Sequence, residues 1–190
     1  ADASNVTLGG SMFLNFNNPS VGVAKPVTVT GLTITGTSSA NYTLTQPTLS
    51  ADITRKELTV SGLSAANKVY NQNTNATISG VPVLNGGVSA DALPAALSLS
   101  GVPSGAFLDK NVGSAKLVNI SGLSITGTSV SNYILTAPTS TANITAATLT
   151  VNASGTSKVY DGNTSAVVTY TDNRFAGDVL TVNGTANFNN

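Results

Sequence analysis

The sequence contains no cysteine, histidine or tryptophan, and charged residues make up only 8% of its 190 residues. Without cysteine there is no disulfide framework, so packing and backbone hydrogen bonds must hold the fold together. Histidine is the commonest general acid–base residue, and Glu57 is the only glutamate, so no carboxylate–histidine pair is available. We therefore predict that the protein is not an enzyme, and that it uses no cofactor.

The charges also balance, giving a formal net charge of zero. A basic surface that could neutralise phosphates is absent, so neither nucleic acid nor an anionic lipid surface is an expected partner. No apolar run approaches the roughly 20 residues that a membrane-spanning helix needs, and we expect no membrane insertion. The sequence starts without a basic and apolar leader, so we expect any export signal to lie outside it.

The sequence repeats itself. The stretch 31–48 returns as 122–139, which places Tyr42 and Tyr133 91 residues apart, and Asn41 and Asn132 just before them. A second motif at 68–74, which includes Tyr70, returns at 158–164 with a spacing of 90 residues. Self-similarity at a fixed period identifies the unit that folds.

The order of the motifs predicts three segments. Residues 1–54 are the C-terminal half of a repeat, residues 55–145 are one complete repeat, and residues 146–190 are the N-terminal half of another. No Gly/Ser linker separates the copies, so we expect a stiff rod. The partial copies indicate either an excerpt from a longer array, or a subunit whose end is completed by the start of the next chain. The second arrangement would build fibres.

The composition predicts an all-β fold. Threonine, valine and isoleucine are frequent and favour strands, while asparagine, glycine and serine punctuate the chain every 8–12 residues as turns. We expect tandem, elongated β-sandwich repeats of the immunoglobulin-like (Ig-like) type. A β-grasp-like unit is the alternative if residues 91–97 form a helix, which Pro94 would limit.

The motif at 158–164, Lys-Val-Tyr-Asp-Gly-Asn-Thr, with Tyr160, Asp161 and Gly162 at its centre, resembles the signature of the YDG repeat, which is related to the MBG repeats of bacterial surface proteins. The stretches 107–113 and 132–135 resemble later parts of the same repeat. In the middle copy Gln72 replaces the glycine, which predicts that a glycine-dependent turn is not essential there. The resemblance implies a surface stalk or adhesive fibre like filamentous haemagglutinin, with no catalytic residue.

The recurring polar and aromatic residues have structural and functional interpretations. Asp161, Asp172 and Asp178 could offer oxygens to calcium, but no spacing matches a known calcium loop, so we predict turn capping and no metal site. The recurring tyrosines are predicted to pack on the core with their hydroxyls bonded to neighbouring groups. Tyr170 and Phe175 lie outside the motifs and are the ligand-contact candidates.

Three functions therefore compete, and all are extracellular, on a bacterial cell surface. The first is a non-enzymatic stalk repeat of a large adhesin, whose partners are neighbouring repeats of the same protein. The second is a self-assembling fibre subunit that forms a head-to-tail homopolymer. The third is a carbohydrate-binding adhesive module that contacts host or matrix glycans.

Overall fold

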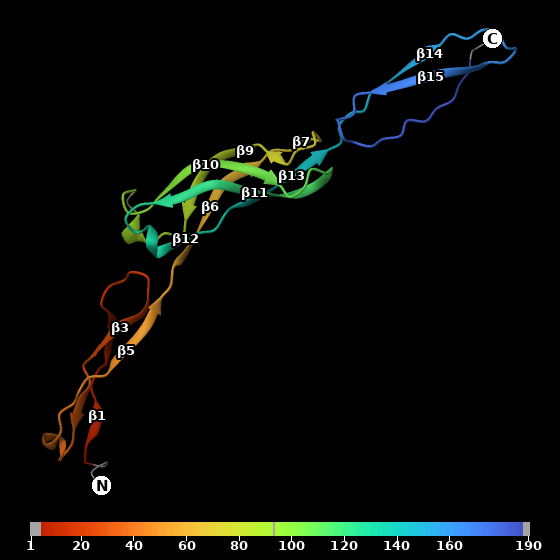
Figure 1. The fold of residues 1–190 in the computed structure, drawn as a ribbon. Helices are drawn as coiled ribbons and strands as arrows, with labels where there is room; N and C mark the ends of the chain where they lie inside the picture. Colours follow the sequence, from red (N-terminus) through yellow and green to blue (C-terminus); the bar gives the residue numbers. More distant parts are fainter. Residues whose placement is uncertain (1–4, 93, 188–190) are drawn as a thin grey trace. The chain divides into compact units, whose positions relative to one another are not determined.

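The computed structural model describes residues 5–92 and 94–187. Within these residues the regular structure consists of sixteen β-strands and three short 3-10 helices (Figure 1). The fold is therefore all-β, as the composition predicts. Two compact units divide the chain. The first comprises residues 1–61, 82–102 and 123–137, and the second comprises residues 62–81, 103–122 and 138–190.

The first segment of the first unit forms two small antiparallel sheets. Strands β1 (Thr7–Gly9) and β4 (Thr33–Thr35) pair with each other. Strand β3 (Gly22–Thr30) lies between β2 (Phe13–Phe16) and β5 (Thr48–Ile53). A 3-10 helix, η1 (Ser39–Asn41), precedes Tyr42.

The middle copy repeats this order 91 residues later. Strands β10 (Ser98–Phe107) and β11 (Gly113–Thr126) are followed by the 3-10 helix η3 (Val130–Asn132), and then by β12 (Tyr133–Leu135) and β13 (Thr139–Thr145). Both copies carry a β-bulge at the same place, where Ala24 and Ala115 adopt a φ of 49°. Sequence similarity therefore extends to backbone detail.

The first half of the middle copy supplies four strands, two of which pair with β12 and β13 of the second half. The four strands are β6 (Lys56–Ala65), β7 (Lys68–Val69), β8 (Asn75–Ala76) and β9 (Ile78–Asn85). They give a sheet of order β12-β6-β9 and a sheet of order β7-β13-β11-β10-β8. Strand β12 is parallel to β6, and β13 is parallel to β7.

The last copy forms one sheet of order β14-β15-β16. Its strands are β14 (Val151–Thr156), β15 (Ser165–Asp172) and the two-residue β16 (Ala186–Asn187). Among the described residues, eight of the nine buried hydrophobic side chains belong to the middle copy. One cluster in the first unit contains Leu58, Leu97 and Tyr133. The second unit contains the other, which is built from Phe107, Val118, Ala142 and Ile144.

Residues 91–97 do not form the α-helix on which the β-grasp-like alternative depends. The described part of this segment follows the 3-10 helix η2 (Ser89–Asp91) and continues as turns at residues 94–96. Pro94 has no N–H to donate, which limits helical structure here. Residue 93 lies outside the described residues.

Candidate functional site

The Lys-x-Tyr motif is a loop closed by its own lysine. In the middle copy the ammonium of Lys68 donates to the backbone oxygens of Asn73 and Asn75, at 2.8 and 3.1 Å, and to the Asn73 side chain at 2.9 Å. In the last copy Lys158 donates to the backbone and side-chain oxygens of Asn163, both at 2.8 Å. The lysine thus satisfies carbonyl groups that the loop leaves without a ladder partner.

The turn inside this loop is left-handed in both copies. Gly162 has a φ of 77°, and Gln72 at the same position has a φ of 64°. The middle copy therefore keeps the left-handed turn but forms it without glycine. Gln72 adopts the glycine-like conformation itself, at a cost of about 1–2 kcal/mol for a residue with a Cβ. Its side-chain amide donates to Asp178 at 2.9 Å, which offsets part of that cost.

The Asn-Tyr motif of the middle copy surrounds a carboxylate that the sequence analysis did not single out. The hydroxyl of Tyr133 donates to Asp91 at 2.7 Å, and the hydroxyl of Ser129 donates to the other carboxylate oxygen at 2.7 Å. The Val88 N–H donates to the Tyr133 oxygen at 3.2 Å. Tyr133 is 4% exposed, so its hydroxyl both donates and accepts a hydrogen bond in a buried position.

These contacts also shift the ionisation of the pair. Burial raises the pKa of Tyr133 above its ordinary value, and the hydrogen bond to Asp91 adds to the increase. The hydrogen bonds from Tyr133 and Ser129 lower the pKa of Asp91. Both shifts favour a neutral tyrosine that donates to a charged aspartate. The pair is therefore a structural hydrogen bond, in which the tyrosine keeps its proton and the aspartate accepts.

The same motif in the first copy is more open. Tyr42 is 50% exposed and Asn41 is exposed. Residues 1–54 contain no equivalent of the Asp91 segment, because Asp91 belongs to the other half of the repeat. Asn132, the counterpart of Asn41, accepts a hydrogen bond at 3.0 Å from the backbone N–H of Val21. Asn132 therefore joins the middle copy to the first one within the same unit.

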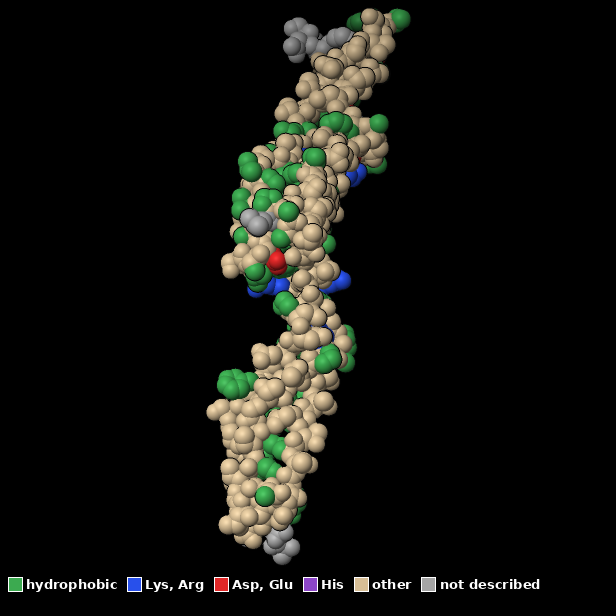
Figure 2. All heavy atoms as spheres, turned by 90° about the vertical axis from the view of Figure 1, so that its left-hand side faces the viewer, with side chains coloured by type: hydrophobic (Ala, Val, Ile, Leu, Met, Phe, Trp, Pro, Cys, Tyr) green, Lys and Arg blue, Asp and Glu red, His purple; other side chains and the backbone are tan. Residues whose placement is uncertain are grey.

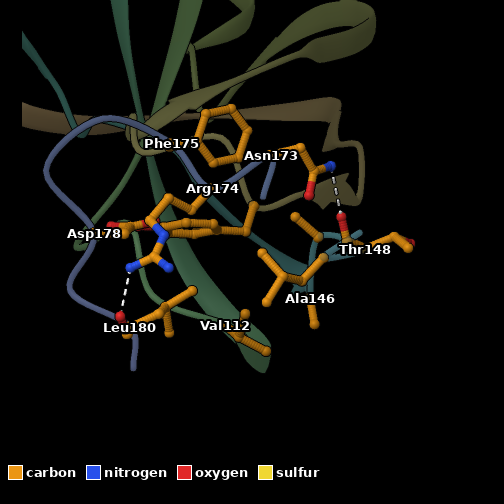
Figure 3. Close-up of a pocket in the computed structure, with 11 residues that line it drawn as sticks. Val112, Ala146, Thr148, Asn173, Arg174, Phe175, Asp178 and Leu180 are labelled. Carbon is orange, nitrogen blue, oxygen red and sulfur yellow. Dashed lines mark hydrogen bonds between the residues drawn. The ribbon is translucent and has the colours of Figure 1, made fainter. Parts of the chain in front are cut away.

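A second aspartate, Asp178, is one of the residues that line a cavity in the second unit (Figure 3). The hydroxyl of Tyr70 donates to Asp178 at 2.9 Å. The ring of Tyr70 also meets that of Phe175 edge to face, with centroids 5.8 Å apart. The hydrogen bond to Asp178 raises the pKa of Tyr70, and the bonds from Gln72 and Tyr70 lower the pKa of Asp178.

The cavity has a volume of about 290 Å³ and is mainly apolar. Val112, Leu149 and Leu180 line it together with Phe175, and Arg174 reaches across it toward the Leu180 carbonyl (Figure 3). Arg174 also forms a two-pronged ion pair with Asp172, which lowers the pKa of that carboxyl to about 2. Tyr170, the other ligand-contact candidate, lies against Gly184 instead.

At two positions of the repeat one copy has aspartate where the other has asparagine, and the hydrogen bonds explain why both are accepted. Asp52 and Asn143 both accept the N–H of the bulge alanine, Ala24 or Ala115, at 2.7 Å. Asn71 and Asp161 both accept an N–H two residues further along, at 3.4 and 3.1 Å. Either side chain provides the required oxygen, so the charge is not needed.

The described residues contain no group of three or more histidine, cysteine, aspartate or glutamate side chains that could hold a metal ion. Nor does the part of the chain that the structure describes include a helix long and apolar enough to cross a membrane. Charged side chains cover only small areas of the face shown in Figure 2. The candidate site is thus a set of repeat-specific contacts and one cavity.

Sequence reasoning missed the partners of the motif residues. The recurring motif already contained Lys68 and Lys158, but not the backbone carbonyls that these lysines contact. Asp91 and Asp178, which accept the tyrosine hydroxyls, are equivalent only if the alignment of the copies includes a deletion. In both, the aspartate N–H bonds the carbonyl three residues earlier, at Val88 or Phe175.

Comparisons with known proteins agree with the repeat. Searches of curated proteins and of solved structures gave no match. A family profile described as YDG domain matches residues 1–49 and again residues 54–142. The two matches are consecutive and cover more than half of the sequence, and the 91-residue spacing of β-strands and turns follows the same order. The chain therefore belongs to the YDG domain family.

Proposed function

We propose that this chain is a non-enzymatic structural segment of a large bacterial surface protein, in which successive units of about 90 residues build a stiff extracellular stalk. The observation that carries this proposal is the use made of the recurring polar residues. Lys68, Asn73 and Asn143 bond backbone groups within the repeat, and Asn132 bonds the preceding copy. The motifs hold and join units, which is the chemistry a stalk requires.

We further infer that each complete repeat is a β-sandwich, built only from strands of the kind found in the middle copy. The parallel pairs β6–β12 and β7–β13 distinguish it from an Ig-like sandwich with purely antiparallel sheets. In each parallel pair one strand comes from the first half of the repeat and the other from the second half. Such pairs make each half dependent on the other.

Carbohydrate binding has less support from the contacts. Phe175, the aromatic side chain considered as a platform for sugars, packs edge to face against Tyr70. A sugar ring stacks on an open aromatic face. The ring of Phe175 instead contacts Tyr70, and this contact joins the last copy to the middle one. We therefore favour the stalk.

The proposed stalk is tested by measuring how the length of the molecule grows as repeats are added. Additional copies of residues 55–145 would be inserted in tandem into the full chain, and the maximum dimension would be measured by small-angle X-ray scattering. A stalk predicts the same increment for each copy. A radius of gyration that rises only as about the 0.38 power of residue number would describe a globule and contradict the proposal.

A further inference from the structure

The Lys68 loop of the middle copy borders a second, polar cavity, which the proposed stalk does not use. This cavity has a volume of about 320 Å³, which is within the range of small-ligand sites, beginning at about 300 Å³. All of its lining residues lie between residues 66 and 77, so it belongs to the complete copy alone. The polar lining consists of Asn67, Lys68, Asn71, Asn73, Asn75 and Thr77.

Backbone donors fix the orientation of three of these asparagine side chains. The Asn67 side-chain oxygen accepts the Asn143 N–H at 2.7 Å. The Asn73 oxygen accepts the Asn75 N–H at 3.1 Å, and the Asn71 oxygen accepts the Asn73 N–H at 3.4 Å. Because the oxygens are bonded in this way, the NH₂ groups remain available as donors. Among the described residues, none of these NH₂ groups donates to a protein acceptor.

The lysine at this cavity carries a charge that no carboxylate neutralises among the described residues. The Lys68 ammonium donates to three oxygens of its own loop and lies 5.6 Å from the centroid of the Phe107 ring, and all of these partners are neutral. Asp178, which the loop contacts through Gln72, lines the other cavity and not this one. Burial lowers the pKa of Lys68, as expected for an ammonium without a counter-charge.

The equivalent loop of the last copy supplies its own counter-charge. Asp161 stands in the position of Asn71, and its carboxylate lies 2.7 Å from the Lys158 ammonium. This contact lowers the pKa of Asp161. Both loops share the left-handed turn and the lysine–asparagine hydrogen bonds. The exchange of aspartate for asparagine therefore leaves the lysine of the middle copy without an acidic partner.

We propose that the cavity at Lys68 binds an oxyanion, a carboxylate or sulfate group, which accepts hydrogen bonds from the asparagine NH₂ groups and is attracted by the lysine charge. An oxyanion has several acceptor oxygens and supplies the charge that this loop lacks. A cation would meet no acidic side chain in the lining. An apolar ligand would leave the buried amide donors unpaired. Free sulfate and the carboxylate of an acidic sugar present the same chemistry to this site.

An NMR titration of the full chain would test the site through the side-chain NH₂ signals of the asparagines. The ligands are sodium sulfate, sodium glucuronate and glucose, with sodium chloride holding the ionic strength constant because salt screens exposed charges. Sulfate and glucuronate should cause saturable shifts of the same lining asparagines, whereas glucose, which lacks the carboxylate, should not. Tighter binding of glucuronate would identify an acidic sugar as the preferred source of the oxyanion, and tighter binding of sulfate would identify a free anion.

Two matched variants isolate the uncompensated charge. Asn71→Asp introduces the counter-charge that the last copy has, and should weaken anion binding about tenfold, as the loss of a charge-assisted interaction predicts. This variant should fold, because Asp161 forms the same turn and accepts the Asn163 N–H at 3.1 Å. Asn119→Asp makes the same charge change at an exposed residue of the second unit outside the lining, and should bind like the unmodified chain.

Three results would overturn the proposed anion site. These are no saturable shift with either anion, equal shifts with glucose and glucuronate, and equal binding by the Asn71→Asp and Asn119→Asp variants. The site is independent of the proposed stalk, since its lining residues all belong to one copy. A chain that binds no anion but lengthens equally with each added repeat would refute the anion site and leave the stalk intact.

Discussion

Leu58 and Leu149 occupy the same place in two copies of one repeat, as do Tyr133 and Tyr42. In the complete copy the leucine and the tyrosine are buried against each other's strands, whereas in the partial copies both are about half exposed. The local turns hardly differ, since the bulge alanines and the 3-10 helices recur 91 residues apart. Local structure is therefore a property of the half-repeat, and burial is a property of the pair of halves.

The largest expected difference between the copies concerns the leucines. Leu58→Ala removes a fully buried side chain and should lower the free energy of unfolding by about 2–5 kcal/mol. Leu149→Ala changes a side chain that is already half in water, so we expect a change within about 0.5 kcal/mol. Urea denaturation of dilute chains would measure both. Equal losses would mean that Leu149 is buried in solution.

The buried tyrosine hydroxyl should have the next largest effect. Tyr133→Phe leaves Asp91 without one donor and the Val88 N–H without its acceptor, which should cost about 1–3 kcal/mol. Tyr160→Phe, at a side chain that is almost fully exposed, serves as the control and should change stability by less than about 0.5 kcal/mol. Thermal unfolding followed by circular dichroism would compare the two. Similar melting curves for both variants would contradict the structural role of Tyr133.

The bulges test whether local strain is the same in complete and partial copies. Ala24 and Ala115 both have a φ of 49°, in the left-handed region that disfavours a Cβ. Replacing either one by glycine should relieve strain and raise stability by about 0.5–1 kcal/mol. Amide hydrogen exchange in β3 and β11 would measure the effect on each copy. A gain at one position alone would show that the two bulges are not equivalent.

Acid should affect the last copy through its ion pair. Arg174 lowers the pKa of Asp172 from 3.8 to about 2, so the stabilisation is present above the unfolded pKa near 3.8. It is lost as the pH falls through about 2, because the protonated carboxyl no longer pairs with the guanidinium. An NMR titration of the Asp172 carboxyl carbon should have its midpoint near 2. Arg174→Lys should move that midpoint upward, since lysine cannot form the two-pronged bond.

Much of the fold could be predicted because the period is explicit. The 91-residue spacing predicted which turns and strands recur. The composition predicted an all-β fold, and the structure confirmed it. The recurring Gly36 and Gly127 illustrate why. Both have a φ above 110°, and a Cβ on Gly127 would lie 2.4 Å from the Ala96 oxygen. A backbone requirement of this kind is visible in the sequence as glycine.

The candidate site was predicted less completely. The motif tyrosines were predicted to bond neighbouring groups, and Tyr133 does so, but its acceptor Asp91 lies 42 residues away. Tyr70 bonds Asp178 across 108 residues. No local sequence pattern identifies such a partner, because an aspartate in a turn has the same sequence surroundings whether or not a distant hydroxyl bonds it.

The sequence by itself determined the repeat, the turns and the left-handed positions that glycine occupies, because these depend on residues close together in the chain. Only the tertiary structure decided which copy of each motif is buried and which aspartate each tyrosine contacts. The physical reason is that burial requires a second surface. A half-repeat encodes its own strands, but the complementary half determines whether the apolar side chains on those strands leave water.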